Sequence, residues 1–101
     1  MRASVILVAS ARGNRADEIA GRLRREGTLV LTAHSFEGCL RVATSVGPDL
    51  VVLDSDLPSR LEKLLRAHPI SARARVVHLD QATDVRNQTA QALSGLLARP
   101  V

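Results

Sequence analysis

Short apolar runs alternate along the chain with stretches whose apolar residues repeat at helical spacing. Runs typical of strands occupy residues 4–9, 28–32, 50–53 and 75–79. The run at 4–9 is almost continuously apolar, as expected of a strand buried on both faces of a parallel sheet. The alternation predicts successive strand–helix units, which fold as a three-layer α/β domain with helices on both faces of a parallel sheet.

Two helices are predicted between the first three strands. In the first helix, Asn14 is expected to be the N-terminal cap and Gly27 to end the helix. In the second helix, Ser35 is the expected cap, and Gly47 with Pro48 ends the helix. Their buried stripes are predicted at Ile19, Ala20, Leu23, Phe36, Cys39, Leu40, Ala43 and Val46.

The C-terminal part of the chain allows two arrangements. A third helix is predicted over residues 59–67, closed by His68 and Pro69, and the fourth strand follows. Apolar residues then recur at helical spacing over residues 83–98. They fit one long helix, or a shorter helix followed by a fifth strand at 96–98. Periodicity leaves both open, so the expected sheet has five or four strands.

The length and composition fit one domain. In a chain of 101 residues, a second independently folded unit would have too few residues to bury a core. The 46% hydrophobic and 24% charged residues are typical of a globular protein and not of a disordered segment. Phe36 is the only aromatic residue, so the core must be aliphatic. We expect residues 1–101 to form a single domain.

Nothing in the sequence predicts membrane insertion or export. No apolar run approaches the roughly 20 residues that span a bilayer, and the N-terminal run is too short for a signal peptide. Cys39 is the only cysteine, so no internal disulfide can form, and we expect it to be a thiol in the core. These features predict a cytoplasmic protein without a membrane partner.

The net charge of +4 comes almost wholly from arginine, because Lys63 is the only lysine. A basic domain raises nucleic acid as a possible partner. However, Asp and Glu are interspersed throughout the chain, and aromatic residues that could stack on bases are lacking. Nucleic acid is therefore disfavoured. A basic regulatory domain that binds nucleic acid or a nucleotide through Arg12 and Arg15 is kept as an alternative.

Asp54 is the strongest candidate for a functional residue. It follows the apolar run at 50–53, so its carboxylate is expected at the carboxyl edge of the sheet, where α/β folds place ligands. Asp56 comes two residues later and is interpreted as a solvated turn residue. At residues 10–15 a glycine and two arginines precede a helix, which favours anions, but the stretch is not a phosphate-binding motif.

Other chemistry has little support in the sequence. His34, His68 and His78 are far apart and lack the paired spacing of a metal site. They are expected at the surface, at a helix end and in a strand, respectively. No serine or cysteine has an evident base partner. We therefore predict no enzymatic activity and no metal.

The order of the elements and three local strings resemble the receiver domain of response regulators, the CheY-like domain of two-component signalling. The strings are VILVAS at residues 5–10, REGTLVLTA at 25–33 and PDLVVLDSDLP at 48–58. The resemblance covers nearly the whole chain and implies a flavodoxin-like parallel sheet. It also implies that Asp54 stands where receivers carry the phospho-acceptor.

The sequence departs from the receiver pattern at the positions around Asp54. The acidic pair that holds magnesium together with the acceptor falls on Ser10 and Ala11. The next position, often acidic in receivers, is Arg12. The hydroxyl residue that ends the fourth strand falls on Asp80, and the lysine of the fifth strand falls on Arg99. These departures imply a degenerate pseudo-receiver without a cofactor, in which Asp54 pairs with Arg99 or Arg12.

If this alignment holds, the chain stops before the receiver's final helix and leaves an apolar sheet face to be covered. We therefore predict a phosphorylation-independent module that binds protein partners and associates as a homodimer. The dimer would form through the face around the fourth and fifth strands. The alternative is a working single-domain response regulator that is phosphorylated on Asp54 with Mg²⁺.

Overall fold

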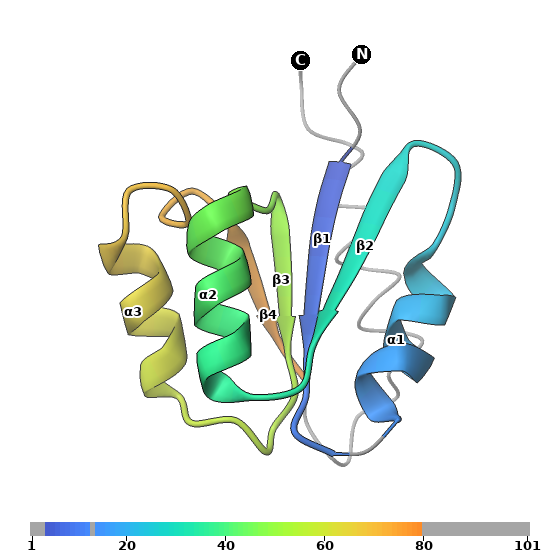
Figure 1. The fold of residues 1–101 in the computed structure, drawn as a ribbon, viewed down its shortest axis with the longest axis horizontal. Coiled ribbons are helices and arrows are strands. Elements are labelled where there is room, and N and C mark those ends of the chain that lie inside the picture. The colour runs from blue at the N-terminus through green and yellow to red at the C-terminus, as the bar shows by residue number, and fades with distance from the viewer. Residues whose placement is uncertain (1–3, 13, 80–101) are drawn as a thin grey trace.

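Strands and helices alternate along the described residues, as Figure 1 shows. The structure is a computed structural model that describes residues 4–12 and 14–79. The strands are β1 (Ser4–Ala9), β2 (Thr28–Ala33), β3 (Leu50–Leu53) and β4 (Arg75–His78). The helices are α1 (Arg15–Leu23), α2 (Phe36–Val46) and α3 (Arg60–Ala67). The predicted alternation of strands and helices is confirmed.

The strands form one parallel sheet in the order β2-β1-β3-β4. Val8 of β1 stands opposite Thr32 of β2 on one side and Val52 of β3 on the other. Right-handed crossovers in this order place α1 on one face and the helices after β2 and β3 on the other face. The flavodoxin-like parallel sheet is confirmed with four strands. The tail at 83–98 and the possible fifth strand lie outside the described residues.

Both faces of the two central strands are buried, which gives the three predicted layers. On one face, β1 and β3 pack against α1 in a cluster that includes Ile6 and Ile19. On the other face, they pack against α2 and α3 in a cluster that includes Leu7 and Leu65. Figure 1 shows α2 and α3 side by side, with α1 apart from them. Successive residues of β1 and β3 therefore point alternately into the two core clusters.

Cys39 lies in the second of these clusters, as predicted, with no exposed surface. Burial raises the pKa of its thiol to about 11, because a thiolate would lose its hydration there. The clusters around it consist of aliphatic side chains with Phe36 at the edge, so the predicted aliphatic core is confirmed. No helix in the described part of the chain is long and apolar enough to span a bilayer.

The ends of α2 follow the predicted capping pattern. The Ser35 hydroxyl accepts a hydrogen bond from the Gly38 N–H at 2.9 Å. This bond satisfies one of the backbone donors that the first turn of a helix leaves free. At the other end, Gly47 takes the left-handed conformation with φ +67°, which residues with a side chain rarely adopt.

The ends of α1 agree with the prediction only in part. Asn14 is the N-terminal cap residue, as predicted, but its side chain makes no cap bond, and the Arg15 N–H after it bonds the Arg12 carbonyl at 2.9 Å. The helix also ends at Leu23, before Gly27. Gly27 serves the turn into β2, where it has φ +85°.

Candidate functional site

Two polar residues meet where β1 and β3 end. Ser10 follows β1 and Asp54 follows β3, and both side chains are buried. The Asp54 N–H donates to the Ala9 carbonyl at 3.0 Å, which continues the pairing of the two strands. The Ser10 hydroxyl donates to Asp54 Oδ2 at 2.8 Å. The position where receivers carry an acidic metal ligand therefore holds a hydrogen-bond donor to the acceptor-equivalent carboxylate.

The charge of Asp54 is balanced by Arg15, the first residue of α1. Arg15 Nε lies 2.6 Å from Asp54 Oδ2, an ion pair in which Asp54 is only 2% exposed. The Arg15 Nε–H makes no hydrogen bond of normal geometry, so the attraction is one of charge. The other carboxylate oxygen, Oδ1, accepts the Ser55 N–H at 2.8 Å. Both oxygens of Asp54 are therefore engaged by the chain itself.

Among the described residues the partner of Asp54 is Arg15 and not Arg12, which corrects the predicted pairing with Arg12. Arg12 instead turns toward the loop after β3, where its Nη2 donates to the Ser55 hydroxyl at 3.2 Å. Arg99 lies outside the described residues, as does Asp80, which was predicted at the rim of the same site. Arg15 reaches Asp54 because α1 begins at the edge of the sheet where β1 and β3 both end.

A second polar contact lies beside the first. Asp56 Oδ2 accepts the Ala11 N–H at 3.0 Å and lies 3.8 Å from Arg12 Nε. The interpretation of Asp56 as a solvated turn residue was wrong, since its side chain is only 16% exposed. The pairing of β1 with β3 brings the two loops together, so the Asp56 carboxylate meets the turn after β1.

The described residues of this site do not fit the magnesium ion of receivers. A hard divalent cation needs several carboxylate or carbonyl oxygens around it. Asp54 already receives two donors and faces the guanidinium of Arg15, which would repel a metal ion. No group of three or more His, Cys, Asp or Glu residues in the described ranges could hold a metal. The two hydrogen-bond donors and Arg15 instead suit a carboxylate whose charge is balanced by a side chain of the same protein.

The three histidines stay apart, as predicted. His34 is at the surface, 4.0 Å from Asp17, and His68 caps the C-terminal end of α3. His78 lies in β4 and contacts Glu62 of α3. Within the part of the chain that the structure describes, no histidine contacts Asp54. They form no common site in the described residues.

Glu62 is the centre of a small surface cluster away from Asp54. It hydrogen bonds to His78 and accepts from Arg66 Nε at 3.0 Å. The bond to His78 and then that to Arg66 lower the pKa of the Glu62 carboxyl. The cluster ties α3 to β4 across the protein surface.

Sequence reasoning missed the partnership of Arg15 with Asp54. It placed Arg15 in a turn that could attract anions, but did not identify an aspartate of this chain as the anion. The available signal was topological. A helix that starts after β1 and an aspartate that follows the neighbouring β3 must share one edge of the sheet.

No protein-family model matches the sequence, and no curated protein matches it. Several solved structures share its fold. The chemotaxis response regulator CheY4 of Vibrio cholerae matches with a TM-score of 0.75 and 13% identity, over 93% of this chain and 98% of that chain. The N-terminal domain of a response regulator receiver protein of Methanoculleus marisnigri JR1 matches with a TM-score of 0.64 and 22% identity, over 95% and 98%.

A response regulator of Desulfuromonas acetoxidans matches with a TM-score of 0.67 and 19% identity, over 91% of this chain and 77% of that chain. At these identities the likeness establishes the fold. The chain has the receiver fold, and its order of elements is the one that the sequence predicts. The polar residues at the strand ends then become the feature from which its function is inferred.

Proposed function

We propose that this receiver-fold domain is a pseudo-receiver, a signalling module that binds protein partners without being phosphorylated. The observation that carries the proposal is that the Asp54 carboxylate is fully bonded within the chain, which we call its closed state. Its carboxylate is buried, accepts from the Ser10 hydroxyl and the Ser55 N–H, and is neutralised by Arg15. Both carboxylate oxygens are held by groups of the chain, which lowers their reactivity toward a phosphoryl group.

The chemistry of phosphoryl transfer supports the proposal. The reaction needs cations that neutralise the charge building on the phosphoryl oxygens, and receivers supply that charge through magnesium. Here Arg15 contacts the carboxylate itself, so its positive charge stabilises unphosphorylated Asp54 and not a phosphoryl group in transfer. Phosphorylation of Asp54 would have to break this ion pair first. The proposal therefore gives the domain no catalytic activity and no cofactor.

The proposed partners are proteins, and the domain is proposed to be cytoplasmic. The arginines that could have bound a nucleotide or nucleic acid, Arg12 and Arg15, both face carboxylates of the chain. Their contacts disfavour the nucleic-acid alternative. We also propose a homodimer formed around β4, whose Val76 and Val77 are half-buried. Light scattering of the full chain at several concentrations tests the dimer, which a monomer at all of them would refute.

The pseudo-receiver proposal is tested by NMR with beryllofluoride and magnesium, which imitate a phosphorylated aspartate. We expect the amide resonances of Ser10, Asp54 and Ser55 to stay unchanged in the natural chain. The matched variant combines Ser10→Asp, Ala11→Asp and Arg15→Ala, which removes the cation and restores an acidic pair. It should gain magnesium-dependent shifts at Asp54. Phosphorylation of the natural chain by acetyl phosphate, abolished by Asp54→Asn, would instead establish a working response regulator.

A further inference from the structure

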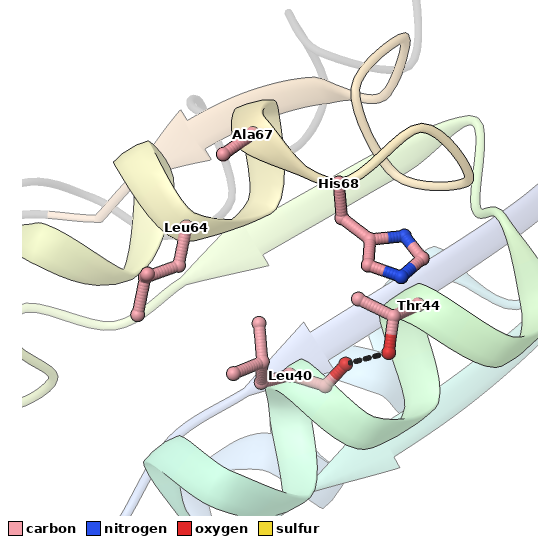
Figure 2. A pocket seen from close by; sticks show the side chains of 5 residues that line it. All are labelled: Leu40, Thr44, Leu64, Ala67 and His68. Carbon is pink, nitrogen blue, oxygen red and sulfur yellow. Dashed lines mark hydrogen bonds between the residues drawn. The ribbon is translucent and has the colours of Figure 1, made fainter.

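A groove between α2 and α3 is open to solvent and lined mainly by apolar side chains. Figure 2 shows its walls, with Leu40 and Thr44 on α2 facing Leu64 and Ala67 on α3, and His68 at one end. Its volume is about 310 Å³. The groove is on the face of the sheet opposite α1 and contains none of the residues around Asp54.

One exposed apolar side chain lies in this groove and another just beyond its end. In the described part of the chain, the exposed large hydrophobic residues are Leu29, Val46, Leu64 and Ile70. Leu64 lines the groove, and the N–H of Ile70 bonds His68 at its end. Ile70 lies against the end of α2, since a Cβ built on Gly47 would be 3.2 Å from Ile70 Cγ2. Exposed apolar surface in a groove is typical of an interaction site.

The two helices that form the groove carry an excess of basic residues. Glu62 is paired with Arg66 and with His78 of β4, away from the groove. The remaining charged residues of the two helices are Arg41, Arg60, Lys63 and Glu37. Arg60 lies one helical turn before Leu64 and stands over the Phe36 ring at 5.0 Å, which joins the N-terminal ends of α2 and α3. The charge beside the groove is therefore mainly positive.

His68 adds a directed polar group at the other end. Its Nδ1 accepts the Ile70 N–H at 3.2 Å, which places the ring proton of the neutral imidazole on Nε2. The ring lies beside Thr44 in Figure 2. The Nε2–H is thus a donor at the end of an apolar groove, suited to a carboxylate or carbonyl oxygen. The Thr44 hydroxyl is used within its own helix, where it donates to the Leu40 carbonyl at 2.7 Å.

We propose that this groove binds an amphipathic helix of a partner protein, one with leucine-like side chains on one face and acidic residues beside them. The apolar face would cover Leu40 and Leu64, and the acidic residues would meet the positive charge beside the groove, as in other helix-in-groove complexes. The inference rests on the proposed interaction function and names its surface and the chemistry of its partner. A nucleic acid fits less well, because three of the five lining residues are aliphatic and none is a Phe, Tyr or Trp on which a base could stack.

The test is an NMR titration of the full chain with a synthetic helical peptide that has leucines at i, i+3, i+4 and i+7 and glutamates on its flanks. We expect shifts centred on Leu40, Leu64 and His68. A peptide with lysine in place of glutamate should bind at least tenfold more weakly. Leu64→Arg should weaken binding of the acidic peptide at least tenfold, although the added positive charge would strengthen purely electrostatic binding.

The matched control is Leu29→Arg, because Leu29 is 50% exposed against 41% for Leu64 and lies on β2, away from the groove. This variant should bind like the natural chain. Equal binding of both peptides, or shifts away from the groove, would overturn the proposal. A dimer of the natural chain that Leu64→Arg makes monomeric would overturn it in favour of a second copy as the occupant.

The outcome also separates this inference from the proposed function. Peptide binding together with phosphorylation of Asp54 would refute the pseudo-receiver and leave the groove as a docking site. An unreactive Asp54 without peptide binding would refute only the groove. Single-stranded DNA that shifts the groove resonances at moderate salt, where the acidic peptide does not, would replace the helix with a nucleic acid.

Discussion

The polar site at the ends of β1 and β3 and the groove between α2 and α3 differ in how their side chains are satisfied. In the first region, a buried carboxylate finds its donors and its cation within the chain. In the second, apolar side chains such as Leu64 stay in water although a buried core lies beneath them. The Asp54 carboxylate therefore needs no external counter-ion, whereas a region that exposes apolar surface gains by binding.

This contrast bears on which surface of the fold binds partners. Receivers respond at the strand ends, where a phosphoryl group adds charge whose effect is felt at another surface. In the described part of this chain, the strand ends already contain a counter-charge for Asp54, and an apolar groove lies between two helices. Under the proposed function, the strand ends are held in one state and the domain acts by binding a partner.

The buried and exposed sides of α3 should differ most in stability. Leu65 is fully buried under the groove, and Leu64 is exposed beside it. Leu65→Ala should lower the free energy of unfolding by about 3 kcal/mol, since it removes core contacts and leaves a cavity. Leu64→Ala should change it by less than about 0.5 kcal/mol. Urea denaturation measures both, and a similar loss in the two variants would mean that the groove is part of the core.

The closed state of Asp54 should depend on Arg15. Arg15→Ala leaves a buried carboxylate without its cation and should cost about 2 kcal/mol. This is below the range of about 3–5 kcal/mol for fully buried pairs, because the Arg15 side chain is 24% exposed. Adding Asp54→Asn should recover much of the loss, because the amide carries no charge.

A double-mutant cycle by urea denaturation at neutral pH gives the coupling free energy of this pair. Arg22→Ala on the same helix is the control, because Arg22 forms an exposed pair with Glu18 and should cost less than about 0.5 kcal/mol. If the Arg15 and Asp54 effects simply add, the two residues do not form the ion pair that closes the site.

The charges of α3 that face β4 should have the smallest effect. His78 and Arg66 hold the pKa of Glu62 below its ordinary value of 4.5, so the pair stabilises the folded chain above that pH. This stability is lost as the pH falls below 4.5 and through the lowered folded pKa. Glu62→Gln should cost less than about 1 kcal/mol at neutral pH.

The same substitution should flatten the decline of stability in acid, measured by urea denaturation from pH 6 to pH 3. Lys63→Gln is the control, since it removes a neighbouring charge of α3 that has no place in the Glu62 cluster. An unchanged acid decline in Glu62→Gln would show that the cluster of α3 with β4 does not form in solution.

Local residue patterns determined most of the fold. The apolar runs at 4–9 and 50–53 become β1 and β3, because continuous apolar segments are stable only when both faces are covered. Ser35 and Gly47 fixed the ends of α2 through bonds and backbone conformations that involve only near neighbours. Asn14 lies at the cap position of α1, but the pattern could not show that its side chain makes no cap bond, because that depends on the turn before the helix.

The candidate site was only partly predictable from the sequence. The strand before Asp54 placed its carboxylate at the sheet edge, and the absence of acidic residues at positions 10 and 11 predicted a pocket without a metal pair. The choice of Arg15 over Arg12 needed the tertiary structure, because it depends on where α1 begins relative to β3. The partly buried Asp56 depended in the same way on two loops that are far apart in sequence.

The sequence by itself therefore determined the order of the elements, the aliphatic core and the lack of acidic residues at positions 10 and 11. These follow from periodicity and residue type, which act over a few neighbouring positions. The tertiary structure alone decided that Arg15 closes the Asp54 site and that α2 and α3 leave an apolar groove between them. Such features arise from distances between separate elements, because only packing sets which side chains meet and which stay exposed.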